Sequence, residues 1–220
     1  MAVNCGVSFG VCVVRVTQVN AEGDPSGVAD NAYVTDAVTS ISVTPNIETG
    51  NTFSQRNGCG CSVARFKAND TFNWFEFTFQ NSKLEPGLMS LLLGDTVISD
   101  GADAVGEAFG SALGCDEDEP AVALEFWTKH VVGSGPDSIH PWIHWVFPKT
   151  VWQLGDNTFE EGIALPTVNG FSRTNTAWGT GPYGDGPPGA ADISEGGWWK
   201  TATDPPEATC DFIDVAGSTA

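Results

Sequence analysis

Three histidines are the first candidates for chemistry in this sequence. His140 and His144 are four residues apart, the spacing at which a helix can present two imidazoles to one zinc ion. Pro141 and the aromatic residues around it instead predict a strand, on which positions four apart are separated by roughly 13 Å. This pair therefore cannot chelate one ion, and no Gly-x-Ser-x-Gly motif or Cys–His pairing accompanies His130. We expect neither a metal site nor a nucleophilic hydrolase.

The cysteines are the next candidates. Cys59 and Cys61 are separated by one residue, which is shorter than the spacing usual in structural zinc sites. The amino terminus lacks the basic and apolar regions of a signal peptide, which favours a reducing compartment. We therefore predict free thiols, in preference to metal ligands or disulfides, for all six cysteines: Cys5, Cys12, Cys59, Cys61, Cys115 and Cys210.

Carboxylates are abundant, and two of them at the right separation could act as acid and base on a glycosidic bond. Most lie in Gly-rich loops, however, whereas a carboxyl group with a raised pKa is expected inside an apolar strand. Asp116–Glu119 lacks the glycine and terminal glutamate of an EF-hand calcium loop. A polysaccharide-acting β-sandwich, either a carbohydrate-binding module or a glycosidase, stays as an alternative function, because sugars stack on aromatic rings such as those of Trp142, Trp145, Trp198 and Trp199.

The charge balance excludes several classes of partner. The 220 residues contain 9 Lys and Arg against 28 Asp and Glu, a formal net charge of −19. Such a chain repels nucleic-acid phosphates and anionic membrane surfaces. The Gly-rich stretch Gly179–Gly184 has no lysine and no strand-to-helix context for cradling a phosphate. We therefore expect no membrane partner and no specific nucleic-acid binding. Because the sequence contains no catalytic signature, we also expect no cofactor and no enzyme activity.

Alternation of apolar and polar residues predicts a mainly β protein. Aromatic residues occupy every second position of Phe75–Phe79, which places their rings on one face of a strand. Ile41–Val43 and Val122–Phe126 alternate in the same way, and Ile143–Phe147 is apolar on both faces, as expected of a central strand. Three further strands are predicted, over Cys61–Lys67, Val151–Leu154 and Phe159–Leu165.

One short helix is predicted over Glu85–Gly94, where Pro86 suits the first turn and Gly94 suits a left-handed end. Ala102–Leu113 is rich in alanine, but its glycines favour a loop over a helix. Asp95–Glu119 contains many acidic residues and no Lys or Arg, so this insert is expected to lie in solvent.

These elements predict a three-part organisation. Residues 30–173 form a β-sandwich core that carries the acidic insert 95–119. Residues 1–29 form an amino-terminal segment that we expect to contact other subunits. Residues 174–220 are rich in Gly and Pro and are expected to form an arm that packs on another surface, such as a neighbouring subunit. The aromatic residues assigned to that contact are Trp178, Tyr183, Trp198 and Trp199.

Four stretches carry a resemblance to a known family: Ile41–Gly50 running into Asn57–Gly60, the aromatic strand Phe72–Phe79, the helix Glu85–Gly94, and Thr176–Tyr183. Together they resemble the major tail protein, the tail tube subunit, of long-tailed bacteriophages, and are most similar to those of actinobacterial phages. The resemblance implies an antiparallel β-sandwich or partial barrel with one short packed helix. Subunits of this family form hexameric rings whose sheets join into a continuous β-barrel, and the rings stack into a tube.

This resemblance also implies a location and partners. The chain would be synthesised in the host cytoplasm and reside in the virion tail, where viral DNA passes through the tube during ejection. Besides further copies of itself, it would contact the tape measure, tail terminator and distal tail proteins. Another virion structural role, in the head or baseplate, suits the same composition and stays open.

Two physical arguments fit a tube subunit independently. Open sheet edges invite pairing, so neighbouring copies that complete each edge would supply the force of assembly. A negative wall repels DNA and leaves it free to slide. The candidates for a position on the lumen or its rim lie at or beside strands whose other face is apolar: Glu48, Glu76, Glu160 and Glu161.

Overall fold

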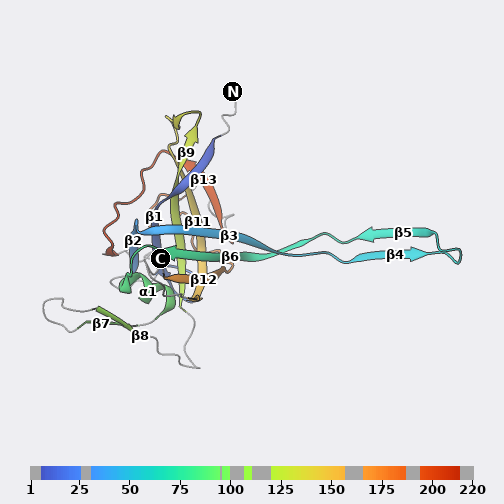
Figure 1. Ribbon diagram of the computed structural model, residues 1–220, viewed down its shortest axis with the longest axis horizontal. Coiled ribbons are helices and arrows are strands. Elements are labelled where there is room, and N and C mark those ends of the chain that lie inside the picture. The colour runs from blue at the N-terminus through green and yellow to red at the C-terminus, as the bar shows by residue number, and fades with distance from the viewer. Residues whose placement is uncertain are drawn as a thin grey trace, which may run out of the picture.

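The computed structural model shows a large antiparallel sheet that curls on itself without closing, and a long ribbon that projects from it (Figure 1). The structure describes residues 6–25, 31–94, 96–99, 107–110, 120–156, 166–186 and 194–213. Within these ranges, the main sheet contains ten strands in the order β14-β2-β1-β9-β11-β12-β6-β3, with β10 beside β9 and β13 beside β11. The prediction of a mainly β sandwich or partial barrel with one short helix is confirmed.

The elements have the following bounds. The strands of the main sheet are β1 (Val7–Val19), β2 (Ala32–Thr35), β3 (Val38–Glu48), β6 (Thr71–Asn81), β9 (Ala121–Val132), β10 (Gly135–Pro136), β11 (Trp142–Leu154), β12 (Thr167–Ser172), β13 (Gly197–Thr201) and β14 (Asp211–Ile213). Two separate strand pairs are β4 (Thr52–Arg56) with β5 (Ser62–Lys67), and β7 (Thr96–Ser99) with β8 (Glu107–Gly110). The helix is α1 (Pro86–Leu93).

The main core fills the inside of the curled sheet. Phe77 and Phe79 of β6 are buried there, as their alternation predicted, while Glu76 and Thr78, which alternate with them, face outward. Leu124 and Phe126 of β9 meet them from across the core. β3 also lies against β1 without backbone pairing, which curves the sheet into a partial barrel. Each fully buried ring contributes roughly 1.5–3 kcal/mol to the free energy of unfolding.

β11 is the central strand that the sequence predicted. Ile143, Val146 and Phe147 are buried, and β9 pairs along one edge while β12 and β13 share the other. Val151–Leu154, predicted as a separate strand, is the continuation of β11 past a register shift between Phe147 and Thr150. One long strand thus replaces two short ones.

The helix α1 follows its sequence signals. Pro86 occupies the first turn, and Gly94 ends the helix in the left-handed conformation with φ 74°. Leu88, Leu91 and Leu92 pack into the main core. Because the helix is about two turns long, this packing, and not intrinsic propensity, holds it.

The predicted domain boundaries differ from the structure at both ends. β1 lies within residues 1–29, yet it is an inner strand between β2 and β9. Residues 174–220 also contribute β13 and β14 to the main sheet. Within Ala102–Leu113, expected to be a loop, Glu107–Gly110 forms β8. The predicted strand Phe159–Leu165, with Glu160 and Glu161, lies outside the described residues, as does most of the insert 95–119.

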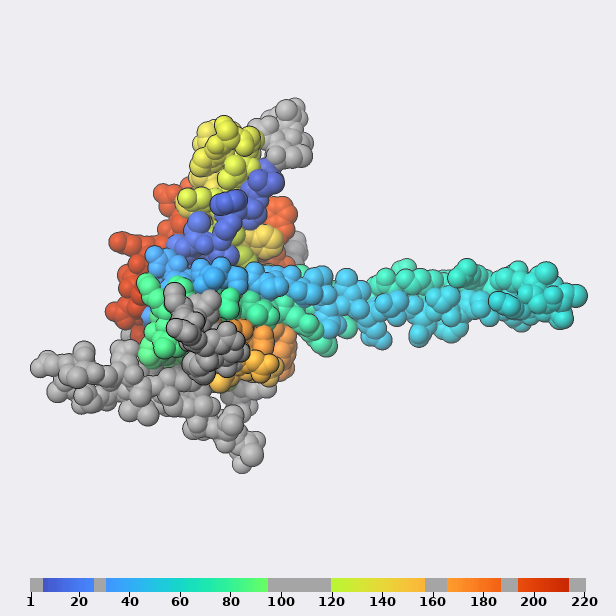
Figure 2. Space-filling view, in the orientation of Figure 1, coloured from blue at the N-terminus to red at the C-terminus, as the bar shows by residue number. Residues whose placement is uncertain are grey.

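The ribbon that leaves the body continues the direction of β3 and β6. Its strands β4 and β5 pair with each other, and the predicted strand Cys61–Lys67 is confirmed as β5. We call residues 50–69 the arm. Figures 1 and 2 show that the arm stands clear of the body along most of its length, so its side chains face solvent on all sides.

Candidate functional site

The arm exposes a pair of stacked aromatic rings. Phe53 of β4 and Phe66 of β5 are direct cross-strand partners, with ring centroids 6.5 Å apart and planes at 23°. They are 61% and 65% exposed. Val63, at the irregular position of the ladder, is 64% exposed. A two-stranded hairpin is at best marginally stable alone in water, so these exposed rings are a candidate surface for contact with another molecule.

A tight turn builds the tip of the arm. The side-chain Oδ1 of Asn57 accepts hydrogen bonds from the backbone N–H groups of Cys59, at 3.1 Å, and Cys61, at 2.9 Å. Gly60 takes the left-handed conformation that the turn needs, with φ 84°. Both cysteines are free and exposed. Cys12 and Cys210 are also free but half-buried, and Cys5 and Cys115 lie outside the described residues.

The arm is positively charged in a strongly negative chain. Residues 50–69 contain Arg56, Arg65 and Lys67 and neither Asp nor Glu. The other 200 residues carry the remaining 6 Lys and Arg and all 28 Asp and Glu, a net charge of −22. Lys67 forms an exposed ion pair with Asp70 at 3.0 Å. Arg56 and Arg65 form no hydrogen bond or ion pair with any residue that the structure describes.

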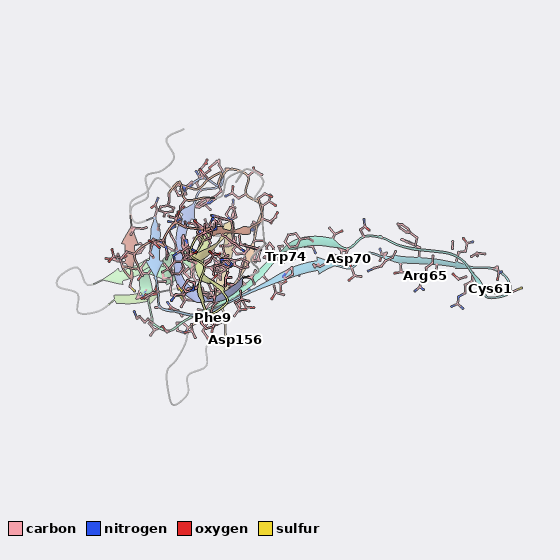
Figure 3. All side chains as sticks on the ribbon, turned by 90° about the horizontal axis from the view of Figure 1, so that it is seen from above. Phe9, Cys61, Arg65, Asp70, Trp74 and Asp156 are labelled. Atoms are coloured by element: carbon pink, nitrogen blue, oxygen red, sulfur yellow. The ribbon has the colours of Figure 1, made fainter. Side chains whose placement is uncertain are left out.

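Figure 3 shows Trp74 where the ribbon leaves the body, Asp70 further out where the arm begins, and Arg65 and Cys61 towards the tip. The backbone N–H of Gly50 donates to Asp70 Oδ1 at 2.9 Å across the ribbon. This hydrogen bond, together with Lys67, lowers the pKa of Asp70 below its ordinary value. The ionised carboxylate of Asp70 therefore joins the two strands of the ribbon where β3 and β6 pass into the arm.

An open groove of about 590 Å³ lies on the outer face of the sheet beside the root of the arm. Its lining combines aromatic rings with hydrogen-bonding side chains: Trp74, Glu76, Phe77, Thr78, Gln153, Asn169, Gly170 and Phe171. Glu76 Oε1 accepts hydrogen bonds from Asn46 Nδ2 at 2.7 Å and Trp74 Nε1 at 3.3 Å. Its Oε2 has no hydrogen-bond partner among the described residues, so the groove presents an open carboxylate oxygen.

A buried network of charged and aromatic side chains lies beneath residues 174–186, which we call the covering segment. Arg15 of β1 donates to both oxygens of Glu125, at 2.7 and 2.9 Å, and to both oxygens of Asp185, at 3.1 and 3.0 Å. Its guanidinium carbon lies 3.3 Å from the ring centroid of Tyr183 and 5.0 Å from that of Trp127. One arginine thus ties the covering segment to the sheet through two carboxylates and two rings.

The ionisation of this network follows from its charges. Burial opposes ionisation of Glu125, but Arg15 and the neighbouring His144 outweigh it and lower the pKa of Glu125 to about 2. His144 Nε2 lies 3.2 Å from Glu125 Oε1, and the geometry is not that of a hydrogen bond. Burial raises the pKa of Tyr183 to about 12. Near neutral pH, Glu125 is therefore charged and Tyr183 is neutral.

The aromatic residues of the carboxyl-terminal region that the sequence assigned to contact with another subunit divide into two groups. Trp178 is buried beside Val19 and Val146, and Tyr183 covers Arg15, so both make contacts within their own chain. Trp199 is half-buried against His144. Trp198 is 55% exposed beside Trp145 and stays a candidate for contact with another subunit.

The predicted acidic residues lie near the arm where they are described. Glu48 is exposed at the end of β3, and Glu76 is exposed on β6 in the groove. The paired histidines of the sequence separate: His144 stacks on Trp127, with centroids 4.0 Å apart, whereas His140 is exposed. Among the described residues, no three His, Cys, Asp or Glu side chains are placed to hold a metal ion together. The same residues include no helix with the length and apolar character needed to cross a membrane.

Sequence reasoning missed the arm and the network around Arg15. A local signal for the arm exists, because residues 50–69 combine three basic residues with no acid in a chain of net charge −19. The network has no such signal. Arg15 and Glu125 are 110 residues apart, and only the pairing of β1 with β9 makes them neighbours.

No protein-family model matches the chain, and no curated protein matches it. Among solved structures, it is similar to a chain in a cryo-EM structure of an extracellular contractile injection system, the PVC sheath-tube complex in the extended state. The TM-score is 0.30 and the sequence identity 11%, over 75% of this chain and 87% of that chain. A likeness at this level establishes neither a family nor a shared fold.

Proposed function

We propose that the protein is a structural, non-enzymatic subunit that assembles with copies of itself into the tube of a virus tail. The observation that carries this proposal is the arm, which exposes Phe53 and Phe66 and whose strands β4 and β5 pair only with each other among the described strands. Covering one such ring stabilises an interface by roughly 1.5–3 kcal/mol. Self-association would supply this cover for every copy.

The edges of the main sheet support the same proposal. Among the described strands, β3 pairs along one side only, with β6, and β14 pairs along one side only, with β2. Unpaired edges present rows of backbone donors and acceptors to neighbouring chains. Rings, proposed to be hexameric from the resemblance given above, would pair such edges between neighbours and extend the partial barrel into a continuous wall.

The charge of the body suits a conduit for DNA. Outside the arm the chain carries a net charge of −22, which repels phosphates from any wall that it forms. Glu48 is the described acidic residue that we propose for the lumen or its rim, since it is exposed at the end of β3. A head or baseplate protein would share this charge but would form a different particle.

Electron microscopy of the purified protein, combined with sedimentation velocity over a wide concentration range, tests the proposal. We expect rings and stacked tubes whose abundance rises with concentration. A variant in which residues 51–68 are replaced by Asn-Gly should keep its circular dichroism spectrum and stay monomeric. A wild-type protein that never forms rings or tubes would overturn the proposal, and closed shells would indicate a head protein.

A further inference from the structure

We propose that the arm of one copy docks in the groove beside the root of another copy's arm. This inference rests on the proposed self-assembly and names the two surfaces that meet. The partner is therefore a second copy of this chain, and the contact joins two different surfaces, the part of one arm around Phe53 and Phe66 and the outer face of the next copy's sheet around Trp74 and Phe171.

The apolar parts of the two surfaces correspond. On the arm, Phe53 and Phe66 form a stacked pair that is exposed to solvent. In the groove, Trp74 is 39% exposed, and Phe171 is half-buried on the neighbouring strand β12. Aromatic side chains each bury about 150–250 Å² when covered and prefer offset or edge contacts with other rings. Each surface thus offers exposed rings that the other surface can cover.

The charges correspond as well. By strand alternation, the side chain of Arg65 points to the opposite face of the ribbon from that of its neighbour Phe66. An arm that lies in the groove can therefore place the Phe66 ring against one wall and the Arg65 guanidinium against the other. Arg65 has no anionic partner among the described residues, and Glu76 has an open Oε2. The guanidinium carbon of Arg173 lies 5.2 Å from the ring centroid of Phe171. We pair Arg65 of one copy with Glu76 of the next.

The arm cannot fill the groove of its own chain. Trp74 marks the groove at the root of the arm, and the arm extends away from it (Figure 3). A contact between two different surfaces repeats from copy to copy and builds rings or stacks instead of closed dimers. The aromatic area is also smaller than the roughly 1,200–2,000 Å² of a stable interface. The contact must therefore add to others, and its loss should raise the concentration needed for assembly.

Charge reversal tests the proposed ion pair. Arg65→Glu and Glu76→Arg should each raise the concentration for half-maximal assembly about tenfold, and the double variant should restore assembly to within about threefold of wild type. Arg56→Glu makes the same change of charge nearer the tip and is the matched control. Equal loss with Arg56→Glu, or no rescue in the double variant, would overturn the pairing. Circular dichroism would show that all variants are folded.

Photo-crosslinking separates this inference from the proposed function. With p-benzoylphenylalanine in place of Phe66, assembled protein should crosslink to peptides that contain Trp74 or Phe171 of another copy. Mixed assembly of isotopically labelled and unlabelled chains identifies crosslinks between copies by mass spectrometry. Crosslinks elsewhere in a protein that still forms tubes would overturn the docking and leave the proposed function intact. Failure of the wild-type chain to assemble would overturn the proposed function first.

Discussion

The arm and the network around Arg15 combine the same kinds of side chain with opposite outcomes. Arg15 lies between two rings and two carboxylates and is 2% exposed. Arg65 lies beside stacked rings on the arm, where the structure describes no carboxylate partner for it. The buried set is complete within one chain, whereas the exposed set is, in the proposed docking, completed by a second copy. An arginine beside aromatic rings thus stabilises the fold in one region and is proposed to serve association in the other.

The largest expected effect is on folding. Arg15→Met leaves Glu125 charged and buried without its partner, and such a loss typically costs about 3–5 kcal/mol. Chemical denaturation followed by tryptophan fluorescence would measure this change in the free energy of unfolding. The matched substitution Arg65→Met on the arm should change it by less than about 0.5 kcal/mol. Similar costs in both variants would contradict the comparison.

A fall in pH should have the second-largest effect, because it weakens the buried network around Arg15. The pKa of Glu125 is about 2 in the folded state against an ordinary value of 4.5, so its contribution is fully present above pH 4.5. It is lost as the pH falls from about 4.5 towards 2, by an amount on the order of a few kcal/mol. Denaturation at a series of pH values would show this loss. Glu125→Gln should flatten the profile in that window, and an unchanged profile would show that Glu125 is not the group responsible.

Loosening the covering segment should have an intermediate effect. Asp185→Asn keeps the shape of the side chain but removes one charge from Arg15, and we expect a cost of about 1–2 kcal/mol. Hydrogen exchange should speed up at the backbone amides around Trp178 and Tyr183 while β9 and β11 stay protected. Uniformly faster exchange across the sheet would mean that the segment does not open separately.

The smallest effect on folding should accompany the removal of the exposed rings. The double substitution Phe53→Ser and Phe66→Ser is expected to change the free energy of unfolding by less than about 0.5 kcal/mol, yet to raise the assembly concentration at least tenfold. Phe77→Ala in the main core provides the contrast, with an expected cost of about 3–5 kcal/mol. If the protein still assembles at the wild-type concentration without both rings, the arm is not part of the interface.

Local patterns predicted the parts of the fold that depend on neighbours in sequence. The alternation over Phe75–Phe79 located β6, and Pro86 with Gly94 located α1, because each signal lies within one element. The central position of β11 also followed from its apolar residues on both faces. These elements needed no knowledge of their partners.

The parts that sequence reasoning missed depend on distant pairing. The ladder between β1 and β9 has register shifts around Val11, next to Gly10 with φ 64°, and these irregularities interrupt the alternation that marks a strand. Nothing in the sequence around Arg15 distinguishes it from an exposed surface arginine, and only the pairing with β9 places Glu125 opposite it. For the candidate site, Glu76 was identified on its own strand, but nothing local placed it in a groove with Phe171 of β12.

The continuity of the arm with β3 and β6 has a mechanical consequence. The hydrogen bonds between antiparallel strands run across the strand direction, and β6 is paired with β3 on one side and β12 on the other. Tension applied to the arm along its axis therefore loads these bonds in shear, so that many must break together. A tube whose copies were joined through such docked arms would resist stretching without any covalent link between them.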